Sequence, residues 1–380
     1  MKINANSVTF EPQDMAFVKK FGILKATEMA LDYHAEHPNL PFLYDAEQLA
    51  GFLGISRGEL NDIVNHIQKE YKEAHLPKKD GTYRSLCVPS IRLRFCQDPI
   101  KEKILPQLPV SKFATAYQKG STTRGNAEPH IGKKFLLKLD ITDFFGSITF
   151  EQVQRTAFNT RYVSRQVGYL LTSLCCKDDS LPQGAATSPA LSNIVMYRFD
   201  DYIGRWCSQR QIAYTRYCDD MTFSANRPLY GVYQKVKTML REMGFELNES
   251  KTHFIGNDNR QSVTGLVVNE KLSIPSGYKR DLRQEVYYAL KFGVEDSVLH
   301  GHRSDFVEDG RPICCPTYML HLMGKVQYVL QIEPENLWFK DAQKKLLAYI
   351  YEHYSESLSY YLHFNKNGKG KGMYEQSNPV

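Results

Sequence analysis

The stretch that decides the fold is residues 212–224, Ile-Ala-Tyr-Thr-Arg-Tyr-Cys-Asp-Asp-Met-Thr-Phe-Ser. Apolar and aromatic residues recur on both sides of Asp219 and Asp220, which predicts two short strands joined by a turn at the aspartates. Adjacent carboxylates repel each other unless a cation joins them, and Mg²⁺ prefers oxygen ligands of this kind. The stretch therefore predicts a β-hairpin with a cation site at its tip.

A third carboxylate, Asp140, ends an apolar strand predicted within residues 136–145, Leu-Leu-Lys-Leu-Asp-Ile-Thr-Asp-Phe-Phe. A carboxylate at such a place is costly without a metal or another cation nearby. Three strand-end carboxylates brought together describe a two-metal site for in-line phosphoryl transfer. An isolated Asp-Asp pair is more often a solvated turn, but the distant third carboxylate favours the metal site.

The paired aspartates are not expected to be equivalent ligands. Consecutive residues of a regular strand point to opposite faces, so Asp219 and Asp220 cannot both face the metal in the same way if both lie within a strand. Asp143 also follows the first strand, and we expect it to serve a turn or a helix cap. The catalytic and metal-binding residues predicted are Asp140, Asp219 and Asp220.

Further runs, in a fixed order along the chain, point to a family. Residues 181–193, Leu-Pro-Gln-Gly-Ala-Ala-Thr-Ser-Pro-Ala-Leu-Ser-Asn, lie between the two aspartate motifs. With this run between its two aspartate motifs, the chain resembles a reverse transcriptase of the group II intron-like superfamily. Residues 126–130, Asn-Ala-Glu-Pro-His, and 263–265, Val-Thr-Gly, are similar to the bacterial retron branch. Each run alone is weak, but five in the right order are strong; they cover roughly residues 71–269.

The resemblance implies an α+β right-hand polymerase fold with fingers, a palm and a helical thumb. We expect the following regions: an N-terminal helical region at 1–70, fingers at 71–135, a palm at 136–270 with part of the fingers at about 150–185, an RNA-binding helical thumb at 271–364, and a flexible basic tail at 365–380. In the N-terminal region, Ser56 and Glu59 have the spacing of a capping box at the start of an amphipathic helix.

The resemblance also implies a set of nucleotide-binding residues: Lys78, Arg84, Ile141, Phe145, Gln183 and Lys251. Phe145 follows Asp140 by five positions, where the family places an aromatic ring that excludes a ribose 2′-OH; Phe144 is expected in the core. Arg84 and Lys78 would contact the triphosphate. Lys251 would protonate the leaving pyrophosphate. An ordinary surface lysine is the alternative for Lys78 and Lys251.

Contact with RNA is expected from Asn126, His130, Lys279, Arg280 and Arg283. The net charge of +6 does not by itself indicate nucleic-acid binding. Basic residues are concentrated before Asp140 and again after residue 278, so they flank an acidic centre, as expected for a protein that grips a polyanion. For any one of these residues, the interpretation that it is an ordinary solvated surface residue is equally good.

The function implied by the resemblance is RNA-directed DNA synthesis with two Mg²⁺ ions and dNTPs. The template would be a partner retron non-coding RNA (msr-msd), primed from an internal guanosine 2′-OH. The product would be branched multicopy single-stranded DNA (msDNA), used in anti-phage defence with a separately encoded effector protein. The alternatives are a group II intron-like or other bacterial reverse transcriptase, and a non-catalytic polymerase-like RNA-binding protein. Without a membrane-spanning stretch or a secretory signal, the chain is expected in the cytoplasm.

Overall fold

The chain folds into two compact units, which we describe separately. The structure is a computed structural model that describes residues 1–4, 7–77, 81–158, 163–301, 306–308, 311–312 and 315–366. Unit 1 comprises residues 1–121 and 137–254, and unit 2 comprises residues 122–136 and 255–380. In the described part of the chain no helix is both long and apolar enough to cross a membrane.

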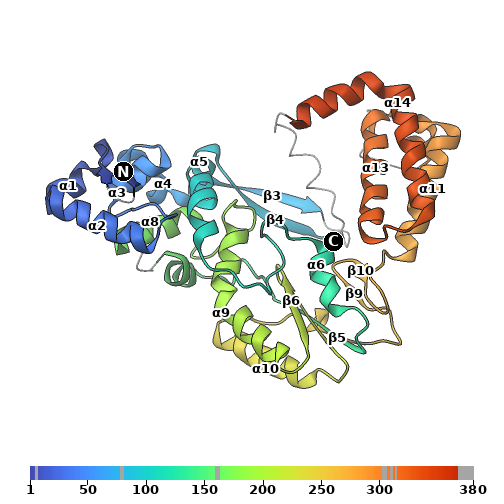
Figure 1. Cartoon of the computed structure of the whole chain (residues 1–380), viewed down its shortest axis with the longest axis horizontal. Coiled ribbons are helices and arrows are strands. Elements are labelled where there is room, and N and C mark those ends of the chain that lie inside the picture. Colours follow the sequence, from blue (N-terminus) through green and yellow to red (C-terminus); the bar gives the residue numbers. More distant parts are fainter. Residues whose placement is uncertain are drawn as a thin grey trace. The chain divides into compact units, whose positions relative to one another are not determined.

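Unit 1 begins with a two-stranded antiparallel ribbon, followed by the helices labelled α1 to α4 near the N-terminus in Figure 1. The N-terminal elements are β1 (Lys2–Asn4), β2 (Ser7–Thr9), α1 (Met15–Phe21), α2 (Ile23–Glu36), α3 (Ala46–Leu53) and α4 (Arg57–Asn65). The predicted capping box is confirmed, because Ser56 and Glu59 each accept a hydrogen bond from the other's backbone at the start of α4. The elements that follow are the antiparallel strands β3 (Tyr71–Pro77) and β4 (Tyr83–Pro89), then α5 (Ile91–Pro99).

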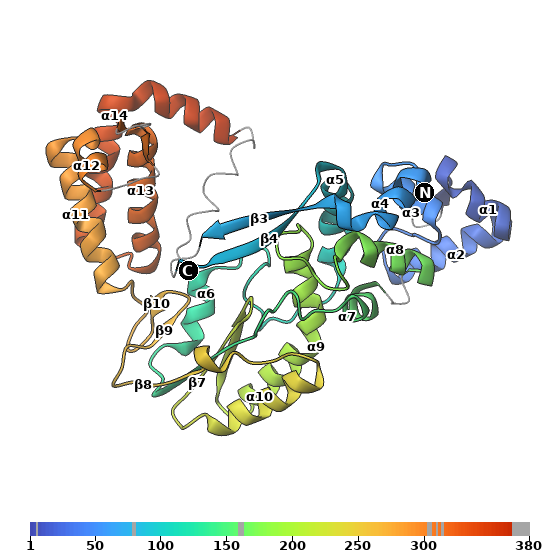
Figure 2. The same cartoon turned by 180° about the vertical axis from the view of Figure 1, so that it is seen from behind.

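Four strands form one sheet in the order β6-β7-β5-β8, and most of their residues belong to unit 1. Its strands are β5 (Phe135–Asp140), β6 (Ala213–Tyr217), β7 (Asp220–Ala225) and β8 (His253–Gly256). The helices that accompany it are α7 (Phe150–Val153), α8 (Arg165–Cys175), α9 (Ser188–Ser208) and α10 (Tyr230–Glu242). Helix α9 packs against β6, and Figure 2 shows β7 and β8 from behind.

The hairpin predicted from residues 212–224 is confirmed. Strands β6 and β7 pair antiparallel, with Tyr214 opposite Phe223. The rings of these two residues stack with their centroids 4.6 Å apart, and both residues are buried. Cross-strand aromatic pairs of this kind fix the register of a hairpin. The apolar residues that predicted the strands therefore anchor the hairpin in the core.

Unit 2 is built mainly from helices. Its elements are α6 (Thr123–Ala127), β9 (Ser262–Val263), β10 (Leu266–Val267), α11 (Ser276–Phe292), α12 (Val294–His300), β11 (Val307–Glu308), β12 (Arg311–Pro312), α13 (Cys315–Ile332) and α14 (Leu337–Lys366). Helix α11 buries Leu282, Val286 and Ala289, which recur at i, i+4 and i+7 and so form one apolar stripe. This stripe packs with residues of α13 and α14 in one core.

Mixed helices and strands confirm the α+β class. Residues 122–136, which were expected in the fingers, belong to the same unit as the C-terminal helices. The expected boundaries of fingers, palm and thumb stay predictions. Most of the predicted tail, residues 367–380, lies outside the described residues.

Candidate active site

The turn of the hairpin decides how the two adjacent aspartates are presented. Tyr217 lies opposite Asp220 in the register, so Cys218 and Asp219 form a two-residue turn. Cys218 has a φ of 60°, the left-handed conformation that short hairpin turns require. Because Asp219 lies in the turn and Asp220 begins β7, the alternation of a regular strand does not separate them. Both carboxylates can therefore serve one site.

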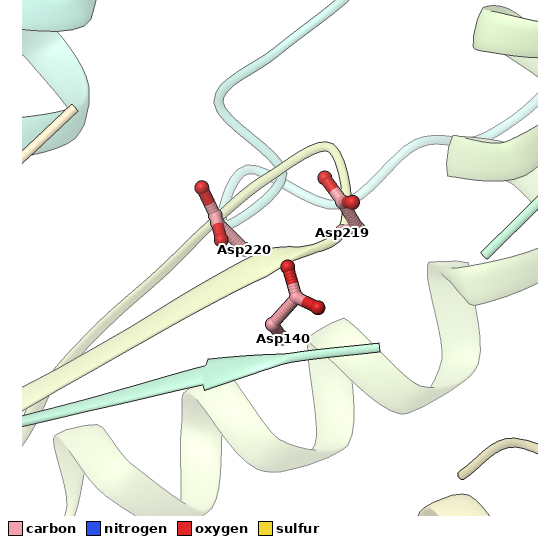
Figure 3. Close-up of side chains that lie close together, drawn as sticks. All are labelled: Asp140, Asp219 and Asp220. Carbon is pink, nitrogen blue, oxygen red and sulfur yellow. The ribbon is translucent and has the colours of Figure 1, made fainter. Parts of the chain in front are cut away.

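Asp140 completes a cluster of three carboxylates. Oxygen atoms of Asp140, Asp219 and Asp220 lie within 4.8 Å of one another, and Figure 3 shows Asp140 at the end of β5 facing the hairpin that carries the other two. Two backbone hydrogen bonds hold the strand end: the Ile141 amide donates to the Asp219 carbonyl (3.3 Å), and the Asn248 amide donates to the Asp140 carbonyl (2.8 Å). The predicted meeting of distant carboxylates is confirmed.

The electrostatics of the cluster favour a bound cation. Burial raises the pKa of Asp219, and the charge of Asp140 adds to the rise. Burial and the neighbouring charge of Asp219 raise the pKa of Asp220 to about 6. Carboxylate oxygens are the ligands that hard divalent cations prefer, and such a cation would offset the mutual repulsion. The residues present therefore fit a divalent metal ion.

Lys251 supplies a positive charge beside this cluster. Its Nζ lies 3.0 Å from Oδ2 of Asp140, in an ion pair whose lysine side chain is 60% exposed. The hydrogen bond to Asp140 raises the pKa of Lys251, so its ammonium form is favoured. The structure thus brings Lys251 to the acidic cluster from a segment more than a hundred residues away.

The two phenylalanines after Asp140 differ in burial. Phe144 is 4% exposed, and its ring lies 5.5 Å from that of Phe145 and 6.2 Å from that of Phe245. Phe145 is only half-buried, which leaves part of its ring accessible. Ile141 is buried. These positions agree with a core role for Phe144, and the contact of Phe145 and Ile141 with a nucleotide stays a prediction.

Gln183 is held against β4 by its backbone. Its carbonyl accepts a hydrogen bond from the Cys87 amide (2.7 Å). The next residue, Gly184, has a φ of +122°, and a Cβ there would lie 2.9 Å from the Cys87 carbonyl oxygen. Only glycine fits this position without strain.

Arg84 is an exposed residue of β4, and its positive charge counteracts the rise in the pKa of Asp219. Lys78 lies outside the described residues.

Asn126 and His130 lie inside unit 2. Their exposed fractions are 1% and 0%. Asn126 Nδ2 donates to Oγ1 of Thr264 (3.3 Å), so the two runs that suggested the retron branch contact each other. Burial lowers the pKa of His130 to about 3. The structure gives both residues a packing role, and their contact with RNA stays a prediction.

The three predicted basic residues of α11 have different surroundings. Lys279 Nζ lies 2.6 Å from Oε1 of Glu333, in a largely buried ion pair. The guanidinium of Arg283 lies over the ring of Trp338, 5.6 Å from its centroid. Arg280 Nε lies 3.5 Å from Oδ1 of the neighbouring Asp281, but this ion pair is at the surface and the Arg280 side chain is 82% exposed. Of the three, Arg280 therefore presents its charge most freely to a partner.

A buried polar network that the sequence motifs did not predict lies behind the turn. Arg216, Asp200 and Asn193 are each at most 1% exposed. Arg216 is the only charged residue of β6 and stands two residues before Cys218, and this placement is the signal that could have identified it.

Comparisons with known proteins identify the family of the chain. Residues 76–268 match the family described as reverse transcriptase (RNA-dependent DNA polymerase). Retron Mx65 reverse transcriptase of Myxococcus xanthus is 31% identical over 320 residues, covering 78% of this chain and 70% of the relative. Retron Ec86 reverse transcriptase of Escherichia coli is 28% identical over 270 residues, covering 70% of this chain and 84% of the relative. Among solved structures, telomerase from Candida albicans in complex with a fragment of telomeric RNA gives a TM-score of 0.41 at 12% identity, covering 76% of this chain and 62% of that chain.

The chain belongs to the reverse transcriptases, the RNA-directed DNA polymerases, and within them to the bacterial retron branch. Its fold is accordingly the right-hand polymerase fold that the sequence predicted.

Proposed function

We propose that Asp140, Asp219 and Asp220 bind two Mg²⁺ ions and catalyse the copying of a partner retron RNA into DNA. The observation that carries the proposal is the cluster itself: three carboxylates from a strand end and a hairpin turn, with oxygen atoms within 4.8 Å of one another. Bound in this way, the two ions would activate the attacking hydroxyl and stabilise the charge that develops on the phosphates.

The chain's own residues would orient the nucleotide. Phe145, with part of its ring accessible, would lie under the sugar and exclude a 2′-OH. Arg84 would hold the triphosphate, because its guanidinium is exposed and close enough to influence Asp219. Gln183, fixed by its backbone bond to β4, would contact the nucleotide near its sugar. Lys251, whose raised pKa keeps it protonated, would deliver a proton to the leaving pyrophosphate.

The exposed face of α11 is the proposed site of RNA selection. Arg280 is 82% exposed, and the rings of Tyr287 and Tyr288 are 50% and 42% exposed. Arg280 and Tyr287 are seven residues apart and so lie near one face of the helix. An exposed guanidinium can contact phosphates, and exposed aromatic rings can stack on unpaired bases. This combination suits a structured RNA with single-stranded loops.

The partner would be a retron non-coding RNA (msr-msd). Synthesis would start from the 2′-OH of an internal guanosine and leave RNA and DNA joined by a branch, the msDNA. The proposal includes a role in anti-phage defence, with an effector protein encoded separately, in the cytoplasm. Membership of the retron branch supports it.

The nucleic acid that copurifies with the protein tests the proposal. We expect one dominant small RNA joined to DNA, and treatment with a debranching enzyme should separate the two. The double variant Asp219→Asn with Asp220→Asn should fold and bind the RNA but carry no DNA, because it lacks two of the three charges that hold the metal. DNA synthesis by this variant would refute the metal site. A product that resists debranching would refute the branched msDNA, and a mixed RNA pool would refute a single partner RNA.

A further inference from the structure

A buried ion pair lies behind the acidic cluster. Arg216 of β6 and Asp200 of α9 both have fully buried side chains. Arg216 Nε lies 2.9 Å from Oδ1 of Asp200, and Nη2 lies 2.5 Å from Oδ2. The hydroxyl of Tyr214 donates to the same carboxylate (2.7 Å). Two nitrogen atoms of the guanidinium thus contact the two oxygen atoms of the carboxylate, which is the close geometry that a buried ion pair requires.

The same guanidinium reaches the turn that carries Asp219. Arg216 Nη1 donates to the carbonyl oxygen of Cys218 (2.7 Å). Cys218 is the turn residue with a φ of 60°, a conformation that non-glycine residues seldom adopt. A charged donor to its carbonyl stabilises the peptide plane between Cys218 and Asp219. The orientation of that peptide decides where the Asp219 side chain points.

Neighbouring segments converge on Arg216 as well. Its Nη2 donates to Oδ1 of Asn193 (3.1 Å), and Asn193 Nδ2 donates to the Ala116 carbonyl (2.8 Å). The Arg216 amide donates to the Phe113 carbonyl (2.8 Å). The guanidinium also lies 5.7 Å from the ring centroid of Phe144, four residues after Asp140. One side chain therefore links α9, the hairpin turn and the segment that follows Asp140.

We propose that Arg216 is a positioning residue of the acidic cluster. With Asp200 and Asn193 it fixes the Cys218 carbonyl and so holds the turn in the shape that brings the Asp219 and Asp220 carboxylates to Asp140. The inference rests on the proposed function in one respect, namely that these carboxylates bind metal. A guanidinium suits this role because its planar fork donates in several fixed directions at once, which an ammonium group cannot do.

Stability alone does not explain the network. Replacing a buried ion pair by apolar residues of similar size is often neutral or stabilising. A purely structural site could therefore be apolar, whereas a group that must hold the Cys218 carbonyl needs a donor. Replacing the ion pair by apolar residues therefore tests whether Arg216 positions the turn or only stabilises the fold.

The first test is the double variant Arg216→Met with Asp200→Leu, which removes both charges together and so leaves no unpaired buried charge. Hydrogen exchange of the Ile141 amide, which donates to the Asp219 carbonyl, should accelerate about fivefold or more, as expected when a buried hydrogen bond nearby is lost. Amides around Ala213 and Ser224, at the far end of the hairpin, should keep their protection. Binding of Mn²⁺, measured by electron paramagnetic resonance, should weaken about 10- to 100-fold.

Activity gives a second readout. The kcat for nucleotide addition should fall about 100-fold, as for a displacement of roughly 1 Å in a catalytic group, with little change in KM for dNTP. Gln97→Leu is the matched control, since it also replaces a buried polar side chain of unit 1, one that donates to Tyr71 and to the Leu174 carbonyl. It should leave Mn²⁺ affinity and Ile141 exchange unchanged.

A milder variant keeps the test decisive if the double variant does not fold. Asn193→Ala leaves the ion pair intact and should shift Ile141 exchange and Mn²⁺ affinity in the same direction by a smaller factor. Unchanged values of both quantities in a folded variant would overturn the proposal. Failure of the wild-type protein to bind Mn²⁺ would instead refute the metal site, and the Ile141 exchange would still decide the role of Arg216.

Discussion

The ammonium nitrogen of Lys251 lies 3.0 Å from a carboxylate oxygen of Asp140, although the two residues are 111 positions apart. This ion pair couples the segment after α10 to the end of β5. Its hydrogen bond raises the pKa of Lys251, so the lysine stays protonated under conditions in which a general acid must carry its proton. The contact makes Lys251 a member of the candidate site, whereas the sequence alone left open whether it is an ordinary surface lysine.

Lys251→Gln should lower kcat by about 100-fold or more, the contribution typical of a general acid, with little change in KM for dNTP. Because the side chain is 60% exposed, the free energy of unfolding should change by less than about 1 kcal/mol. Single-turnover nucleotide addition measures the first quantity and urea unfolding the second. A wild-type rate in this variant would identify Lys251 as an ordinary surface lysine.

Phe145→Val should admit ribonucleotides more readily, because a smaller side chain opens space beneath the 2′ carbon. The measurement is the ratio of rNTP to dNTP incorporation at a single position. Phe144→Ala is the control: it should destabilise the protein by about 3–5 kcal/mol, since the residue is 4% exposed, without changing sugar selectivity. An unchanged ratio in Phe145→Val would mean that this ring serves only packing.

Arg280→Glu should weaken binding of the copurifying RNA. The slope of the logarithm of the affinity against the logarithm of the salt concentration should fall by about the contribution of one phosphate contact. Extension of a generic primed template should be largely unaffected. Lys344→Glu, which reverses an exposed charge on α14, is the control with the same change in net charge. Equal loss of RNA binding in both variants would point to general electrostatics instead of selection by α11.

Arg283 and Lys279 are poorer probes of RNA binding than Arg280. Charge reversal at Arg283 would remove its contact with the Trp338 ring, and reversal at Lys279 would leave Glu333 beside a like charge. Both changes would disturb the packing of unit 2. Loss of RNA binding in these variants therefore would not identify a phosphate contact.

The stability of unit 2 should decrease in mild acid because of His130. Burial, with a smaller contribution from the charge of Lys133, lowers its folded-state pKa to about 3, whereas the unfolded chain binds the proton below about pH 6.5. The unfolded state thus binds more protons between these values, and stability is lost as the pH falls from about 6.5 toward 3. Between pH 7 and pH 5 the loss from this residue should be about 2 kcal/mol.

The exchange of the Gly132 amide, which donates to the Val268 carbonyl, measures this loss after correction for the intrinsic pH dependence of exchange. His130→Gln should flatten the difference between pH 7 and pH 5. The same pH dependence in variant and wild type would assign the acid sensitivity to other groups.

Local patterns predicted much of the site. The alternation of apolar residues around Asp219 and Asp220 predicted the hairpin, and the apolar run before Asp140 predicted the strand that ends there. These signals are strong because strand pairing and burial act on neighbouring residues in the sequence. The order of the short runs then identified the family. The capping box at Ser56 succeeded for the same reason, because it needs only residues three positions apart.

The tertiary structure decided which side chains act together. Sequence alternation suggested that Asp219 and Asp220 could not be equivalent, but the register places Asp219 in the turn. Asn126 contacts Thr264 across 138 positions, and Arg216 pairs with Asp200 from a different element. Lys279 and Arg283, which look like free basic residues in the sequence, are engaged within unit 2. Hydrogen bonds and ion pairs of this kind depend on where distant elements pack. The sequence by itself therefore determined the hairpin, the strand end and the family, whereas only the packing decided the partners of each charge.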